Sequence, residues 1–148
     1  MKTQSTIRLA DFAVLAGRLL LAFIFLHEGV VLALHFDATV KAMAQQGIGL
    51  ATVLGVIALQ LAAGLSVSLG LLTRLGAIAL GLFCLATAAL FHTHFASQNE
   101  LLHFEKDLAM AGGMFVLAVV GAGALSVDGA LRARVPVLLR WPVIVRLL

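Results

Sequence analysis

An apolar stretch at residues 19–34, LLLAFIFLHEGVVLAL, carries two adjacent ionisable side chains, His27 and Glu28. Ionisable groups in such a run need a partner, water or a function, because an unpaired charge in apolar surroundings is costly. On a helix, His27 points about 100° away from Glu28, so we expect the two to act separately and Glu28 to turn inward. Three roles remain open for Glu28: pairing with another residue in the structure, a part in a functional pocket, or snorkelling to the membrane interface.

Four further polar residues are candidates to join Glu28 in one pocket, although Arg18 lies about 9 Å into the first span, in an inner polar layer, and Glu28 about 24 Å. Arg18 precedes it in the same apolar segment, and Gln60 lies near the middle of a later one. His92 and Lys106 fall at the level of Glu28 if each helix rises about 1.5 Å per residue. All five are candidate ligand-binding residues. Arg18 could instead lock helices together, and Gln60 could form a hydrogen bond between helices.

Metal binding is a minor alternative in the outer half of the predicted bundle, where all five histidines lie. His92 and His94 could be a ligand pair on an extended stretch, with His35 and His103 nearby, and a haem would need two histidines on facing helices. No spacing here matches a zinc signature, and histidines are ordinary at membrane interfaces. We therefore predict no metal site and leave the cofactor unidentified.

The composition indicates an integral membrane protein. Of 148 residues, 62% are hydrophobic and 11% are charged, against roughly 25% charged in a soluble domain. So few charges cannot cover a water-exposed surface, and lipid must take that role. The net charge of +3 does not indicate a nucleic-acid partner, since the basic residues end apolar runs. The single cysteine, Cys84, allows no internal disulfide, and we expect it to be inert packing.

Four segments are long enough to cross about 30 Å of hydrocarbon as helices. They predict an all-α transmembrane four-helix bundle in residues 1–128, with spans at 12–36, 48–72, 75–92 and 108–127. Only Thr73 and Arg74 separate the second and third spans, which indicates a tight antiparallel hairpin; residues 37–47 and 93–107 are expected to be loops. Residues 129–148 alternate arginine with bulky apolar residues, and we expect a basic tail on the inner leaflet, or one that docks a partner.

The basic residues also predict the orientation in the membrane. One side receives two of them, Lys41 and Lys106, and the other receives Lys2, Arg8, Arg74, Arg132, Arg134, Arg140 and Arg146. Both termini are therefore expected in the cytoplasm. Arg18 interrupts the first apolar run and no cleavage pattern follows it, so we take this run as a retained span.

A series of short motifs resembles the DoxX family of membrane proteins. In order, they are Gly17-Arg18 followed by FIF and Gly29, the turn GLLTR at 70–74, FEKDLAMAGGMF at 104–115 and the segment 121–128. The resemblance implies a four-helix bundle in a bacterial inner membrane. Some relatives are similar to the membrane subunit of a thiosulfate:quinone oxidoreductase, and others are associated with oxidative-stress and sulfur-handling complexes.

The chain departs from the family pattern at two positions. Leu32 stands where the family often has a lysine, and Gln60 stands where it often has a glutamate. If that lysine and glutamate together carry out a chemistry common to the family, this member has a modified form of it or lacks it.

Three functions remain open. The favoured one is a membrane component of a quinone-, sulfur- or oxidative-stress-linked redox system that holds a quinone or another small apolar ligand near Glu28, Gln60 and His92. The others are a small transporter or permease, which would need a homodimer, and a scaffold whose tail recruits a soluble redox enzyme. The sequence has no nucleophile–base pair or phosphate loop, so the isolated chain is not expected to be an enzyme, although an oxidoreductase subunit fits.

Overall fold

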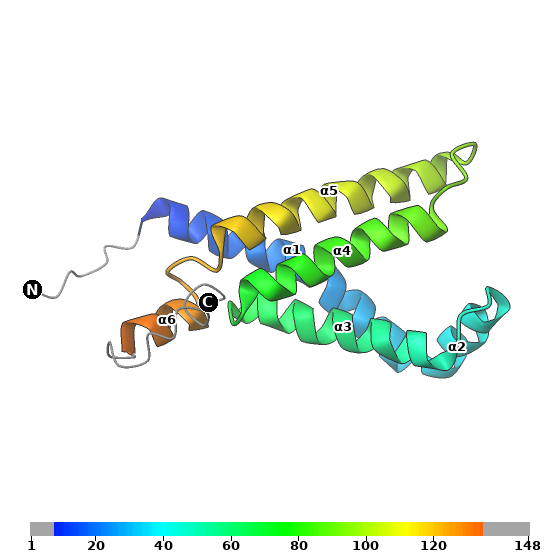
Figure 1. Cartoon of the computed structure of the whole chain (residues 1–148), viewed down its shortest axis with the longest axis horizontal. Coiled ribbons are helices and arrows are strands. Elements are labelled where there is room, and N and C mark those ends of the chain that lie inside the picture. Colours follow the sequence, from blue (N-terminus) through cyan, green and yellow to red (C-terminus); the bar gives the residue numbers. More distant parts are fainter. Residues whose placement is uncertain (1–7, 135–148) are drawn as a thin grey trace, which may run out of the picture.

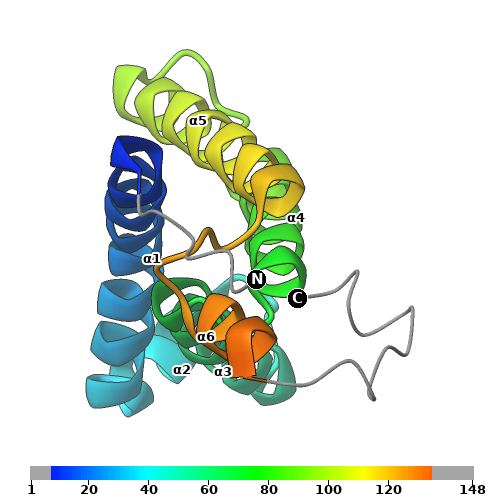
Figure 2. The same cartoon turned by 90° about the vertical axis from the view of Figure 1, so that its left-hand side faces the viewer.

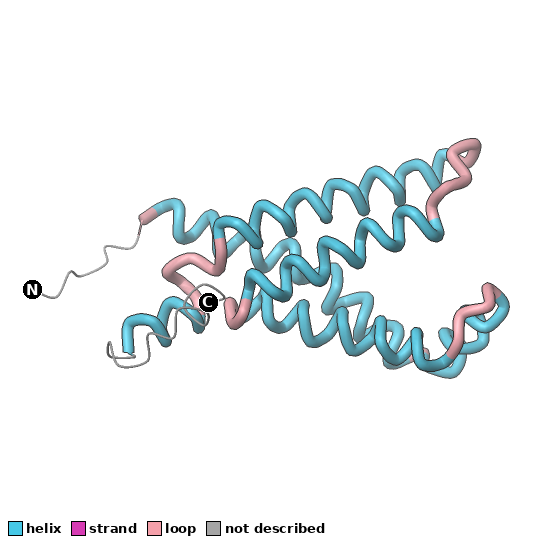
Figure 3. Tube along the Cα trace, in the orientation of Figure 1, coloured by secondary structure: helices cyan, strands magenta, loops and turns pink. Residues whose placement is uncertain are grey.

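The computed structural model describes residues 8–134, and all regular structure in that range is helical, as predicted. The tube in Figure 3 follows long helices joined by short connections. In chain order they are α1 (Leu9–Leu34), α2 (Phe36–Gln45), α3 (Leu50–Leu69), α4 (Thr73–Phe91), α5 (Gln98–Val120) and α6 (Val127–Arg134) (Figure 1). Of these, α1, α3 and α4 are long and apolar enough to cross a membrane.

The four longest helices lie side by side in the order α1, α3, α4, α5, which Figure 2 shows nearly end-on. The pairs α1–α3 and α4–α5 pack most extensively, and the α3–α4 hairpin joins them. By contrast, α1 and α5 touch sparsely. The helices therefore form two tight pairs with a looser seam.

Small residues set the spacing within the pairs. An added Cβ at Gly29 would lie 2.9 Å from the Leu61 side chain, and one at Gly81 would lie 2.9 Å from Phe115. Such close approach increases the packing contacts that hold helices together in lipid. Large apolar side chains cover the outward faces instead, among them Leu20, Phe23, Leu34, Val116 and Val119. This surface is suited to lipid.

The turn between α3 and α4 differs from the prediction. It consists of Gly70, Leu71 and Leu72, whereas Thr73 and Arg74, the predicted linker, belong to the first turn of α4. Gly70 ends α3 in the left-handed conformation at φ 73°, which glycine adopts without a Cβ penalty.

The helix that contains most of the predicted fourth span, 108–127, has different bounds, because α5 begins at Gln98 and ends at Val120. Gly121, at φ 84°, ends the helix. The Arg74 guanidinium donates to the carbonyl oxygens of Ala118 at 3.0 Å and Val119 at 2.9 Å, so it caps this end. The charged first half of α5 keeps it from being apolar along its length.

Two further segments differ from the expected loops and tail. Residues 37–47, expected to be a loop, contain most of α2, and α6 runs across position 128, the predicted end of the membrane domain. The remainder of the predicted basic tail, residues 135–148, lies outside the described residues.

Candidate functional site

A cavity of about 760 Å³ lies among α1, α2, α3, α4 and α5. Most of its wall is apolar and includes Phe25, Val53, Phe83 and Met110. Four titratable side chains, His92, Glu100, Lys106 and Asp107, line it from the end of α4 and the first half of α5, whereas Glu28 and Gln60 line it from α1 and α3.

The cavity brings together four of the five candidate residues from the sequence, namely Glu28, Gln60, His92 and Lys106. The fifth, Arg18, does not line it. Leu32 and Gln60, the two positions that depart from the family pattern, are both on its wall.

Gln60 projects from α3 and is 6% exposed. Its amide oxygen Oε1 is buried and has no hydrogen-bond partner among the described residues. Leaving such an acceptor unpaired costs about 1–3 kcal/mol. A hydrogen bond from Gln60 to a neighbouring helix, one of the two roles considered for it, is therefore not formed through this oxygen.

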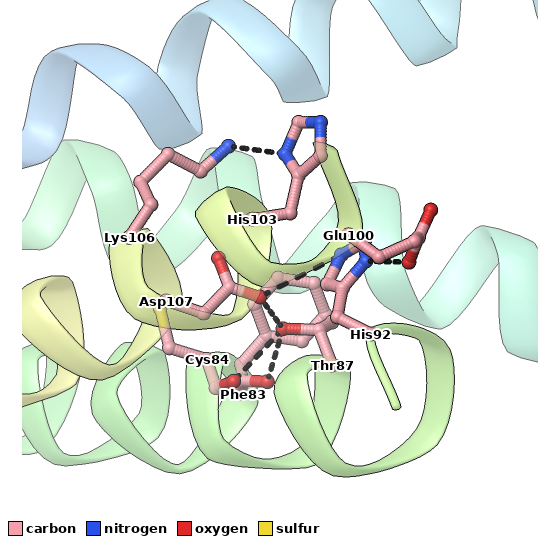
Figure 4. A network of polar contacts seen from close by, with 8 residues as sticks. All are labelled: Phe83, Cys84, Thr87, His92, Glu100, His103, Lys106 and Asp107. Atoms are coloured by element: carbon pink, nitrogen blue, oxygen red, sulfur yellow. Dashed lines mark hydrogen bonds and ion pairs between the residues drawn. The ribbon is translucent and has the colours of Figure 1, made fainter. Parts of the chain in front are cut away.

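His92 caps the C-terminus of α4 and lies between two carboxylates of α5 (Figure 4). Its Nδ1 is 2.9 Å from Glu100 Oε2, and its Nε2 is 3.9 Å from Asp107 Oδ2. The ring also stacks on His103 with centroids 5.1 Å apart. Glu100 lies partly exposed in the first turn of α5, and its hydrogen bond with His92 lowers the pKa of its carboxyl.

Asp107 is a functional candidate that the sequence reasoning did not select. It is 6% exposed and accepts a hydrogen bond from the Thr87 hydroxyl at 2.9 Å. Residues 100, 103 and 107 follow the i, i+3, i+7 spacing of one helix face. That signal was in the sequence, but the segment was expected to be a loop, in which the spacing has no such meaning.

Glu28 and Lys106 do not pair with each other or with His92. Glu28 Oε1 lies 3.7 Å from His27 Nδ1, and both side chains are more than half exposed. The two side chains therefore lie near each other, but Glu28 lines the cavity and His27 does not. Lys106 Nζ lies 3.3 Å from His103 Nδ1.

Arg18 belongs to a second polar cluster at the opposite end of the helices. It is 2% exposed, and it donates from Nη1 to Ala122 O at 2.8 Å and from Nη2 to Leu125 O at 2.9 Å. Asp128, 1% exposed, accepts at Oδ1 from the Leu72 backbone N–H at 3.2 Å. These bonds tie α1 to the segment between α5 and α6, and the α3–α4 turn to the first turn of α6, which matches the locking role considered for Arg18.

The histidines do not assemble a metal centre in residues 8–134, where no three His, Cys, Asp or Glu side chains are grouped to hold an ion. His35 is exposed at the junction of α1 and α2, and His94 is exposed in the connection after α4. Neither lines the cavity, whereas His92 and His103 stack beside it.

Comparison with known proteins gives a consistent result. A family model described as DoxX matches residues 13–93. The chain is 35% identical over 127 residues to the inner membrane protein YqjF of Escherichia coli (strain K12), an alignment that covers 86% of this chain and 98% of that protein. It is 28% identical over 138 residues to the inner membrane protein YphA of the same organism, covering 84% and 99%. No solved structure matches the chain significantly.

Proposed function

The chain belongs to the DoxX family of inner-membrane proteins, and from that premise we propose that its cavity holds a quinone or a similar small apolar ligand. In this role the protein is the membrane component of a redox system and supplies a binding site. The electron-transfer chemistry belongs to partners, among which a soluble redox enzyme is the one we propose.

The observation that carries this proposal is the unpaired amide oxygen of Gln60 inside an apolar cavity. Ligand sites typically enclose about 300–1,000 Å³ and combine apolar walls with a few fixed polar groups. This cavity has both properties. Gln60 supplies one polar contact to a ligand head group, and Phe25 and Phe83 supply apolar wall.

The two positions that depart from the family pattern favour a neutral ligand. Leu32 and Gln60 put an apolar and a neutral polar side chain on the wall where relatives often have a charged pair. An apolar wall with a neutral amide suits a ring that carries oxygen substituents better than it suits an ion.

We also propose how the helices are oriented in the membrane. α1, α3, α4 and the apolar half of α5 cross the bilayer as a four-helix bundle, with both termini in the cytoplasm. The Arg18 cluster then lies at the cytoplasmic end, and the His92 cluster lies at the outer end. The first turns of α5 extend out of the hydrocarbon, which suits Glu100 and Lys106.

Thermal unfolding of the detergent-solubilised protein with decylubiquinone tests the ligand directly. A ligand at roughly one hundred times its Kd stabilises the folded state by about 2.7 kcal/mol, so we expect a clear rise in Tm. Gln60→Leu should abolish that rise. Ala62→Leu, on the exposed side of the same helix, should keep it. An unchanged wild-type Tm at saturating decylubiquinone would refute the quinone proposal.

A further inference from the structure

Asp107 is buried beside the cavity in a setting that satisfies its carboxyl group both with and without a proton. Thr87 Oγ1 lies 2.9 Å from Asp107 Oδ2, 2.9 Å from the carbonyl of Cys84 and 3.1 Å from that of Phe83 (Figure 4). A hydroxyl has one proton to donate and can also accept. An ionised Asp107 receives that proton. A protonated Asp107 donates to Thr87 Oγ1, and the Thr87 hydroxyl turns to a helix carbonyl.

His92 connects this buried carboxyl to a water-facing one. Its Nδ1 is already within hydrogen-bond distance of Glu100, and its Nε2 faces Asp107 at 3.9 Å. The ring needs to move by only about 1 Å to bring Nε2 within hydrogen-bond range of Asp107. Imidazole is suited to relay protons near neutral pH because its two nitrogens can accept and release separately.

We propose that Glu100, His92 and Asp107 form a proton-transfer path between the aqueous end of the helices and the cavity wall. This inference rests on the proposed function, because a ligand that is reduced or oxidised in the cavity must gain or lose protons there. A proton passes from the Glu100 carboxyl to Nδ1 of a neutral imidazole that carries its proton on Nε2. The imidazolium then gives up the Nε2 proton to Asp107 Oδ2. The ring is left with its proton on Nδ1, and it returns to the starting tautomer when Nδ1 gives this proton to water and Nε2 takes one from water.

The other titratable groups around His92 set its charge environment. From α5 it faces His103 and Lys106 in addition to the two carboxylates, and Cys84 and Glu28 line the same cavity from α4 and α1. The cavity residues from α2 and α3 include no titratable side chain. The ring is thus flanked by two carboxylates and by the His103 imidazole, which in turn contacts the Lys106 ammonium.

Infrared difference spectroscopy of the full-length protein without added quinone tests the path. When the pH falls from about 8 to about 4, the range in which histidines and carboxyls titrate, the wild type should gain a protonated-carboxyl C=O band that Asp107→Asn lacks. After a light-triggered proton release, that band should rise about a hundredfold more slowly in His92→Gln and in Glu100→Gln, the scale of lost acid–base assistance. Glu105→Gln, an exposed carboxylate of the same helix, should match the wild type.

Two outcomes would overturn the proposed path. One is a wild type without this band, and the other is a band that rises as fast in His92→Gln as in the wild type. If Asp107→Asn does not fold, Thr87→Val and Thr87→Ser assign the band: valine should shift its frequency, and serine should preserve it. A frequency unchanged by Thr87→Val would exclude Asp107. Because no quinone is present, failure here leaves the decylubiquinone result standing, and the reverse also holds.

Discussion

The Arg18 side chain donates a 2.8 Å hydrogen bond to the carbonyl oxygen of Ala122, although the two residues are 104 positions apart. The bond joins the first long helix to the segment that follows the last one. It explains how a polar cluster in apolar surroundings holds one end of the helices together, while the cavity lies toward the other end.

Replacing Arg18 should therefore lower stability without altering ligand affinity. Arg18→Met removes two charged hydrogen bonds, one buried and one partly buried, each contributing about 1.5–3 kcal/mol, so we expect a loss of several kcal/mol. Chemical denaturation in detergent would measure it. Lys41→Met, on the exposed face of α2, is the control and should change little. A weakened quinone affinity in folded Arg18→Met would contradict a purely structural role.

Gly70→Ala and Gly47→Ala form a matched pair, because both glycines have positive φ, at 73° and 77°. A Cβ at Gly47 would meet nothing within 4 Å, so only the left-handed conformation is penalised, by about 1–2 kcal/mol. A Cβ at Gly70 would collide with the Arg18 guanidinium and with Ser126 Cβ. Thermal unfolding should thus rank Gly70→Ala well below Gly47→Ala. Equal Tm values would show that the Arg18 cluster rearranges around the added methyl group at little cost in stability.

The Glu100–His92 contact should make stability depend on pH. Because the folded-state pKa of Glu100 is lowered, its contribution is present above the unfolded pKa of about 4.3 and is lost as the pH falls through the folded value. Below about pH 4, the wild type should therefore lose its advantage over Glu100→Gln. Tm measured against pH for the two proteins checks this. Parallel curves would mean that the hydrogen bond contributes nothing to folding.

Gln60→Leu should stabilise the empty protein while impairing its function. The substitution removes a buried acceptor without a partner, whose desolvation costs about 1–3 kcal/mol, and replaces it with a side chain of similar size. Denaturation of ligand-free protein would reveal the gain. A destabilised Gln60→Leu would indicate that the amide is satisfied by the protein itself.

Sequence reasoning identified the helical class, the membrane setting and four residues of the cavity wall because these depend on composition and on depth along helices. Glu28, Gln60, His92 and Lys106 could be placed by a rise per residue alone. The ends of the helices were harder to predict from the sequence. The cap that Arg74 forms on α5 depends on a contact between residues 44 and 45 positions apart, which no local pattern records.

The same limitation applied to the polar end of the cavity. Asp107 was treated as a loop residue because four charged residues between 100 and 107 interrupt the apolar pattern. Only the packing of α5 on α4 shows that this carboxylate is buried against Thr87. Conversely, His35 and Glu28 share a helix face by spacing, but α1 ends at Leu34, and His35 does not reach the cavity.

Native mass spectrometry of the protein released from bacterial membranes would show what occupies the cavity in cells. We expect a bound species with the mass of a membrane quinone in the wild type, retained in Ala62→Leu and lost in Gln60→Leu. An empty wild-type protein, or the same adduct in Gln60→Leu at equal occupancy, would contradict the quinone proposal.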